Sequence, residues 1–295
     1  KKAVDRQQTR MSSTYELPQI ITSQPYWVLA SVAIGAASIC VYFLLSGSKK
    51  EKKYVPPTIK DAKKDTVYLF QLQKAWSTSC GSPFCMKMEM YCRMYSIPYI
   101  TRRDFITGPN GKWPWMVLNG EATPDSEIMI RVLRQHFKVQ QPSYSKKIEA
   151  QAHAFKKMIE EALYFVLVYY RWQVDEIYYN HVQPEYFGRV SIPLRWLLIY
   201  LSRPMVLKSL YGQGMGRFKR AEVAKRGFEM LEAISAYLDD KPYFLGDKPH
   251  DIDCTVWSIL EALATVPFEY EIKSFILEKT NLKNYLQRLR SEFWS

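Results

Sequence analysis

The sequence predicts one transmembrane helix, followed by an α/β domain and then an all-helical domain. Three observations support this prediction: a charge-free apolar segment at 26–45, a β-α-β-β-(β)-α pattern over 66–140, and helical periodicity from 144 to 295. Hydrophobic residues make up 47% of the 295 residues, which is enough for a large core or two smaller ones. Charged residues make up 24%, near the globular average, so extensive disorder is not expected.

The formal net charge of +12 is concentrated near the N-terminal end. Residues 1–64 hold 11 of the 41 Lys and Arg and 4 of the 29 Asp and Glu, a net of +7, whereas the remaining 231 residues carry a net of +5. The excess flanks an apolar segment and does not form a stripe on a folded domain, so no nucleic-acid partner is expected. Five cysteines do not make a disulfide framework, which fits a reducing compartment.

Residues 26–45, YWVLASVAIGAASICVYFLL, form the predicted membrane span between an N-terminal segment, 1–25, and a basic linker, 46–65. A helix of that length rises about 30 Å at about 1.5 Å per residue, which matches the hydrocarbon core of a bilayer. The alternative, a cleaved signal peptide, is less favoured because the apolar stretch is long. Lysines follow Leu45 directly, so we expect a single-pass membrane protein whose folded part faces the cytosol.

The first folded domain, 66–140, combines short β-rich runs with helical patterns. Ser82 is predicted to cap its first helix, with Pro83 at the first helical position, where the missing N–H had no partner anyway. The other expected elements are strands at Thr66–Leu72, Ile97–Ile100 and Trp115–Leu118, a hairpin at Asn119–Gly120 and a helix from Asp125–Ser126. This order, with a proline before the third strand, is the plan of a thioredoxin-like domain.

The second domain, 144–295, is predicted to be all-helical. Its apolar residues return at three- and four-residue steps in segments at Ser145–Trp172, Lys219–Leu238, Ile252–Thr265 and Ile272–Trp294. Residues 192–210 are also apolar, but Arg195 and Arg203 interrupt them, so we expect a buried helix and not a second membrane span. The glycine-rich run at 212–216 follows a helix and not a strand, which argues against a dinucleotide-binding loop.

Three segments resemble the failed-axon-connections family, which includes the nematode cadmium-responsive proteins and is related to the metaxins: SPFCMKMEMYCRM (82–94), GKWPW (111–115) and YGQGMGRF (211–218). The first is also similar to the Cys-Pro-Phe/Tyr-Cys site of glutaredoxins, with Ser in place of the first Cys. GKWPWMVLNGE, followed by Asp125–Ser126, is similar to the glutathione-binding segment of glutathione S-transferases. The resemblance covers about Val67 to Trp294, and it implies that the second domain is the all-α C-terminal domain of that superfamily.

The resemblance implies a glutathione site formed by Ser82, Trp113, Pro114, Asp125 and Ser126. Ser82, at a helix start that favours anions, would hydrogen-bond the glutathione thiolate; the alternative is that Ser82 only caps its helix. Trp113–Pro114 matches the cis-proline step of the family. Asp125 and Ser126 match the pair that takes the glutamyl end of glutathione, although an ordinary helix cap would have the same sequence.

The cysteines near Ser82 give one further candidate. Cys80 lies in the loop before the helix and is the second candidate catalytic residue, as a reactive thiol. Cys85 falls on an apolar helical face and is expected in the core. No metal is expected at Cys80, Cys85 and Cys92, because their spacings differ from the paired-Cys pattern of zinc sites.

Two functions are open from the sequence. The first is a membrane-anchored glutathione S-transferase-like protein of stress, cadmium or xenobiotic detoxification, which uses glutathione as co-substrate and a Ser-type site. The second is a non-catalytic adaptor in membrane-associated protein interactions or neuronal development, as in metaxin-like or failed-axon-connections-like proteins. The expected partners are a membrane through 26–45, glutathione, and another protein or a second copy of the chain. Fold analogy does not choose between the two functions.

Overall fold

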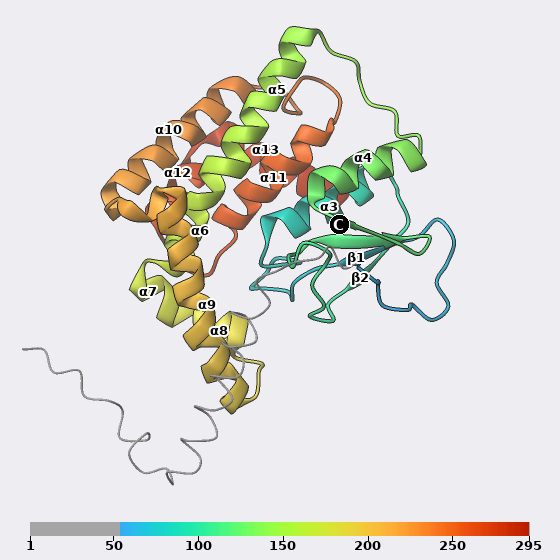
Figure 1. Cartoon of the computed structure of the whole chain (residues 1–295). Coiled ribbons are helices and arrows are strands. Elements are labelled where there is room, and N and C mark those ends of the chain that lie inside the picture. Colours follow the sequence, from blue (N-terminus) through green and yellow to red (C-terminus); the bar gives the residue numbers. More distant parts are fainter. Residues whose placement is uncertain (1–53, 295) are drawn as a thin grey trace, which may run out of the picture. The chain divides into compact units, whose positions relative to one another are not determined.

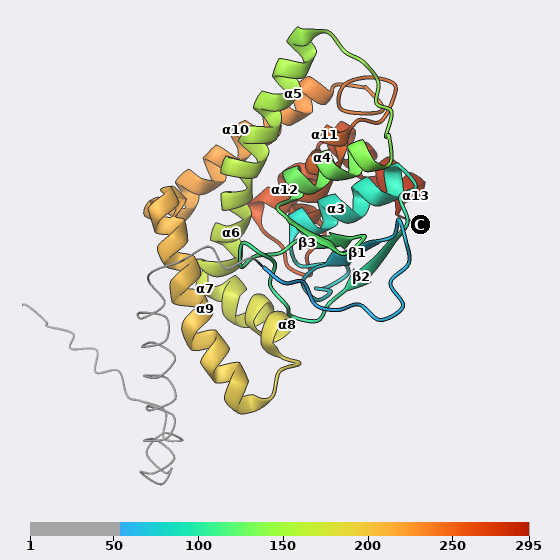
Figure 2. The same cartoon turned by 45° about the vertical axis from the view of Figure 1, so that its right-hand side comes forward.

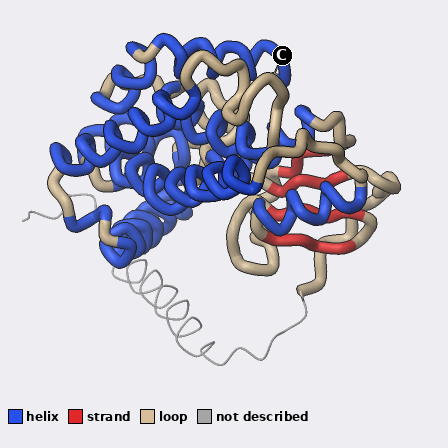
Figure 3. Tube along the Cα trace, turned by 90° about the horizontal axis from the view of Figure 1, so that it is seen from above, coloured by secondary structure: helices blue, strands red, loops and turns tan. Residues whose placement is uncertain are grey.

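The computed structural model describes residues 54–294, which form a four-stranded sheet with its helices and a larger helical domain (Figure 1). The predicted segments 1–25 and 26–45, and the start of the predicted linker, lie outside the described residues. Figure 3 shows the strands gathered in one domain and the helices of the other domain beside them.

The localisation predicted from the sequence is corrected by the structure. No helix within residues 54–294 combines the length and the apolar character that crossing a bilayer requires. The prediction of a single-pass membrane protein with a cytosolic folded part rested on residues 26–45, which are outside the described part of the chain.

The sheet has the strand order β2-β1-β3-β4. Strand β1 (Val67–Phe70) pairs in parallel with β2 (Tyr99–Arg102) and antiparallel with β3 (Trp115–Leu118), which forms a hairpin with β4 (Glu121–Pro124). Helix α3 (Pro83–Met94) connects the two parallel strands, and α4 (Ser126–His136) follows β4. This arrangement confirms the thioredoxin-like plan, although β2 begins two residues later than predicted.

The face of the sheet opposite α3 and α4 packs against the described part of the predicted linker. Tyr54 packs edge-on against Trp115, with 5.6 Å between the ring centroids. The backbone N–H of Lys63 donates to the Tyr68 hydroxyl at 2.9 Å. Tyr68, Phe70, Trp115 and Val117 form a small buried cluster on this face. Residues 54–65 therefore belong to the folded domain and are not a free linker.

The helical domain follows from residue 146 onward, with several short or irregular elements. In chain order these are α5 (Lys146–Met158), the π-helical turn η1 (Ile159–Leu163), α6 (Tyr164–Trp172), α7 (Asp175–Ile177), the π-helical turn η2 (Tyr178–Val182), α8 (Gln183–Phe187), α9 (Ile192–Gln213), the 3-10 turn η3 (Met215–Arg217), α10 (Arg220–Leu238), α11 (Asp251–Ala264), α12 (Glu271–Glu278) and α13 (Thr280–Phe293). The predicted helix at 272–294 is thus two helices, and α7 to α8 had no counterpart in the sequence prediction.

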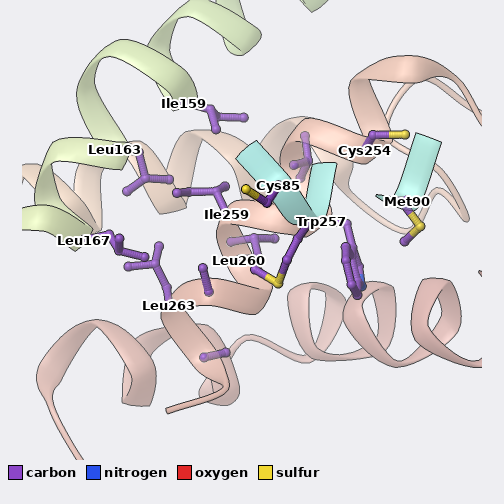
Figure 4. Close-up of a cluster of buried hydrophobic side chains, with 14 of the residues drawn as sticks. Cys85, Met90, Ile159, Leu163, Leu167, Cys254, Trp257, Ile259, Leu260 and Leu263 are labelled. Atoms are coloured by element: carbon purple, nitrogen blue, oxygen red, sulfur yellow. The ribbon is translucent and has the colours of Figure 1, made fainter. Parts of the chain in front are cut away.

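Helix α11 is the centre of the core. All of its residues from Ile252 to Ala264 are buried, and Figure 4 shows Trp257 and Leu260 among side chains of α3 and of the η1–α6 segment. The Asp253 carboxylate is buried and accepts hydrogen bonds from the Phe244 N–H (2.7 Å) and the Tyr285 hydroxyl (2.7 Å). Because every face of α11 is enclosed, both domains contribute to one continuous core.

The start of α11 departs from a standard capping box. Asp253 accepts from the His250 N–H at 2.9 Å, as such a box requires. His250 Nδ1 lies 2.7 Å from an Asp251 carboxylate oxygen and 3.4 Å from the Ile252 N–H. One ring nitrogen cannot donate and accept at the same time, and the shorter contact decides that Nδ1–H donates to Asp251. The imidazole therefore donates a hydrogen bond to Asp251 at the helix start.

Helix α9 is largely exposed, so the prediction of a buried helix at 192–210 is wrong. It packs beside α6 and α8 at the periphery of the helical domain (Figure 2). Leu210 is its one fully buried residue, whereas Trp196 and Tyr200 are 64% and 77% exposed. The apolar composition suggested burial, but only one side of the helix has neighbours among the described residues.

A buried ion-pair network joins the two domains. Lys87 on α3 is 1% exposed and pairs with Glu127 of α4 and, at 2.6 Å, with Glu160 of the π-helical turn η1. Lys156 on α5 completes the network by binding the other Glu127 oxygen at 2.6 Å. These carboxylates hold the pKa of Lys87 above its ordinary value although burial alone would lower it. Lys87 is therefore charged at neutral pH, and its charge is balanced from both domains.

We expect Lys87→Met to destabilise the protein by about 3 kcal/mol, because Glu127 and Glu160 lose the cation that balances them in a buried site. Urea unfolding followed by circular dichroism measures the effect. The matched control is Lys225→Met, whose exposed pair with Glu229 should contribute less than about 0.5 kcal/mol. Equal losses in the two variants would contradict a structural role for the network.

Candidate functional site

Ser82 lies at the start of α3 in extended backbone geometry (φ −104°, ψ 126°), with Pro83 at the first helical position. Its side chain makes no capping hydrogen bond, although the sequence suggested one. The half-buried hydroxyl instead lies close enough to the Cys85 thiol to lower its pKa through a hydrogen bond, although burial dominates and leaves the pKa of Cys85 raised. Free N–H groups and the positive end of the helix dipole at this position favour an anion.

The loop before Ser82 is held against the helical domain. The Arg171 guanidinium donates to the Gly81 carbonyl at 2.6 Å, to the Ala262 carbonyl of α11 at 2.7 Å and to the Tyr186 hydroxyl at 3.0 Å. Arg171 is 4% exposed, so its charge is satisfied by this set of acceptors. Glu185 of α8 fixes the same loop by accepting the Trp76 N–H at 2.9 Å. Residues far away in the sequence thus position Ser82.

Cys80 lies in this loop as predicted, but its side chain is fully buried. Its sulfur accepts from the Ser82 N–H at 3.5 Å. Burial alone would raise the pKa of the Cys80 thiol, but hydrogen bonds from Cys85 and Ser82 and the nearby Arg103 charge bring it below its usual value. Burial raises the pKa of Cys85 well above its usual value, so Cys80 is the more acidic thiol of the pair. Within residues 54–294 no cluster of three or more His, Cys, Asp or Glu is arranged to hold a metal ion.

The other predicted residues lie where β3 begins and where α4 begins. The Trp113–Pro114 peptide bond is cis. Asp125 has φ +65° and caps α4 through one carboxylate oxygen, which accepts the Glu127 N–H at 2.9 Å and the Ile128 N–H at 3.2 Å. Asp125 itself is exposed and Ser126 is 6% exposed. Asp125 therefore caps α4 whether or not it also binds a ligand. Its second carboxylate oxygen makes no capping bond.

The structure brings the starts of α3 and α4 to the same side of the sheet. Lys87, one turn into α3, is bonded to Glu127, the second residue of α4. A cavity of about 10 Å³ next to the start of α3 is lined by Pro83, Phe84, Tyr164 and other residues. That volume holds at most one water molecule, so α3 packs closely against the helical domain from Pro83 onward.

A larger polar cavity of about 520 Å³ extends along α4, α5 and the start of α11. Its charged lining includes Arg131, Arg134, His153, Lys156 and Asp251. Nothing in the sequence marked these residues as site candidates, nor Lys87, Arg171 and Tyr164 near the start of α3. Helical spacing placed most of them on helices, but no sequence signal showed which helix faces would meet.

Two family models for glutathione S-transferases match the chain: the N-terminal domain model covers residues 83–177 and the C-terminal domain model covers residues 227–289. An isoprene-epoxide–glutathione S-transferase of Rhodococcus is 32% identical over 227 residues, which is 74% of this chain and 95% of that protein.

Relatives of lower sequence identity include proteins that are not named as transferases. Failed axon connections of Drosophila melanogaster is 23% identical over 78% of this chain, which spans only 58% of that protein. A metaxin-2 homologue of Caenorhabditis elegans is 25% identical over 62% of this chain and 80% of that protein. Among solved structures, a β-etherase of Sphingobium superposes with a TM-score of 0.56 at 13% identity, covering 76% of this chain and 95% of that one, which shows the shared fold alone.

We expect Arg171→Ala to release the loop before Ser82 and to raise the rate of Cys80 alkylation by about tenfold or more, because a buried thiol reacts only after local opening. Timed iodoacetamide labelling with peptide mapping by mass spectrometry measures this rate. Arg226→Ala, which removes an exposed pair with Glu222, is the control and should leave the rate unchanged. If Cys80 reacts equally fast in both variants, Arg171 does not hold the loop.

Proposed function

Because the chain belongs to the glutathione S-transferase-like superfamily, in the group related to failed axon connections and the metaxins, we propose that it binds glutathione and transfers it to electrophiles. The observation that supports this proposal most strongly is the half-buried hydroxyl of Ser82 at the start of α3, which makes no capping bond to its own helix. A hydroxyl that caps no helix has hydrogen-bonding capacity left for a bound thiolate.

In this proposal Ser82 donates a hydrogen bond to the glutathione sulfur. The bond and the helix dipole favour the charged form and so lower the pKa of the glutathione thiol. The free carboxylate oxygen of Asp125 would accept from the glutamyl ammonium group, and Ser126 would bind the glutamyl carboxylate. The backbone of Trp113, before Pro114, would pair with the tripeptide.

The electrophile class that we propose is an epoxide or a comparable small carbon electrophile, by analogy with the isoprene-epoxide transferase. The thiolate sulfur forms a bond to an epoxide carbon, the carbon–oxygen bond breaks, and the resulting alkoxide takes a proton from water. A role in stress, in xenobiotic detoxification or in the response to cadmium would follow from the same activity.

The second candidate is a non-catalytic role in protein assembly. The small cavity between the start of α3 and the helical domain supports this role, because an electrophile that entered there would have to displace packed side chains. The exposed apolar surface of α9 also supports it, since such surfaces on soluble domains commonly mark interaction sites. Glutathione binding separates the two candidates.

We expect Ser82→Ala to lower the glutathione-transfer rate by about tenfold or more, because a charge-assisted hydrogen bond of ~1.5–3 kcal/mol is lost. Stability should change by less than about 0.5 kcal/mol, because the side chain makes no capping bond. Ser82→Cys should instead confer some thiol–disulfide exchange, since it recreates a Cys-Pro-Phe-Cys sequence.

Calorimetric titration with glutathione, a transfer assay on an epoxide and reduction of a mixed disulfide measure these effects. Ser145→Ala is the matched control, because Ser145 does cap its helix by accepting the Ile148 N–H. That variant should lose ~0.5–2 kcal/mol of stability and keep its transfer rate. Absence of binding at millimolar glutathione in the wild-type chain would refute the transferase proposal and favour the assembly role.

A further inference from the structure

Helix α9 presents an extended apolar surface that no described residue covers. Seven of the fourteen strongly exposed large hydrophobic side chains within residues 54–294 lie on this helix. Five of them are more than 60% exposed: Ile192 (65%), Trp196 (64%), Tyr200 (77%), Met205 (69%) and Tyr211 (61%). Trp and Tyr are the residue types that most often contribute strongly to binding at protein interfaces. Single exposed hydrophobics need no explanation, but a continuous set of this size does.

These side chains occupy a wide arc of the helix. Trp196, Tyr200 and Pro204 follow one another at four-residue steps, so they lie in one row on the helix surface. Met205 and Leu201 form a second exposed row beside it. The opposite side of α9 packs on α6 and α8, as Figures 1 and 2 show. The exposed arc is therefore a single face and not a set of scattered residues.

Within α9 and directly beside it in the sequence, all charged residues are positive. Residues 189–217 contain five Arg and Lys and no Asp or Glu. Arg203 is neutralised by Asp175 at 2.5 Å, and Arg189 approaches Glu185 at 3.7 Å. Lys208 is exposed, and no carboxylate within residues 54–294 pairs with it. An occupant of this face should therefore carry negative charge.

The position of Lys208 discriminates among occupants. By helical spacing its neighbours on the surface are Pro204, Met205 and Tyr211, so its ammonium group stands inside the apolar arc and not at its edge. Acyl chains of a lipid would leave this charge without a partner, which is costly. A second α9 would supply no carboxylate, because residues 192–213 contain no Asp or Glu. A partner side chain with a carboxylate would satisfy it.

We propose that the exposed face of α9 binds an amphipathic helix of another protein, one whose apolar face contains an Asp or Glu that pairs with Lys208. This inference rests on the assembly role, the second candidate function, and specifies its surface and the chemistry of its partner. The surface is separate from Ser82, so it does not depend on glutathione binding.

The test uses the full chain and a synthetic helical peptide of about 21 residues, about 32 Å long, with a Leu/Ile face and one central Glu. A second peptide carries Lys in place of that Glu. Fluorescence anisotropy gives the dissociation constants of both peptides for the wild-type chain, Lys208→Glu, and Lys225→Glu as a control on an exposed lysine of α10. A double variant, Trp196→Ala with Tyr200→Ala, removes the apolar anchors.

The wild-type chain should bind the Glu peptide at least tenfold more tightly than the Lys peptide. Lys208→Glu should reverse this preference, and Lys225→Glu should leave it unchanged. The double variant should bind the Glu peptide tenfold or more weakly than the wild-type chain. Its affinity for glutathione should equal that of the wild-type chain. If the wild-type chain does not bind glutathione but still prefers the Glu peptide, the transferase proposal fails and the proposal for α9 stands.

Four outcomes would overturn the proposal. Binding of neither peptide below millimolar concentration would show that the face does not take such a helix, and equal binding of both peptides would show an apolar surface without charge selection. Stronger binding to vesicles of phosphatidylserine and phosphatidylcholine, or a dimer in sedimentation equilibrium that the double variant abolishes, would assign the face to a lipid surface or to a second copy.

Discussion

Helix α11 has no side that can face water, and this constraint determines how the two domains meet. Its residues from Ile252 to Ala264 are all buried, so neighbouring elements must enclose it completely. Helix α3 of the sheet domain provides one wall, and α6 and η1 of the helical domain provide others (Figure 4). Neither domain therefore completes its core without the other.

The same enclosure sets the geometry of the candidate site. Arg171 donates hydrogen bonds to the Ala262 carbonyl of α11 and to the Gly81 carbonyl of the loop before Ser82. The position of this loop is thereby tied to the position of α11. A side chain that bonds two backbone carbonyls from different segments fixes their separation. The orientation of the Ser82 hydroxyl thus depends on packing in the helical domain as much as on the local turn.

Short sequence motifs predicted the features of the fold that depend on residues adjacent in the sequence, namely helix starts and the hairpin turn. Pro83 marked the start of α3, and Asn119 and Gly120 marked the hairpin, where both residues have positive φ. The predicted positions of Ser82 and Asp125 at helix starts hold for the same reason. Burial was not predictable in this way. Cys80 is enclosed and α9 is exposed because of distant segments that periodicity alone does not locate.

The ion-pair network between the domains also has an evolutionary consequence. Lys87 belongs to the sheet domain, and one of the carboxylates that balance it, Glu160, belongs to the helical domain. A chimera that joined this sheet domain to the helical domain of a relative without that acid would leave the buried Lys87 with Glu127 as its one carboxylate partner in the network. A change at Glu160 therefore alters the electrostatic balance of a lysine in the other domain, so the two halves of the chain are coupled at this boundary.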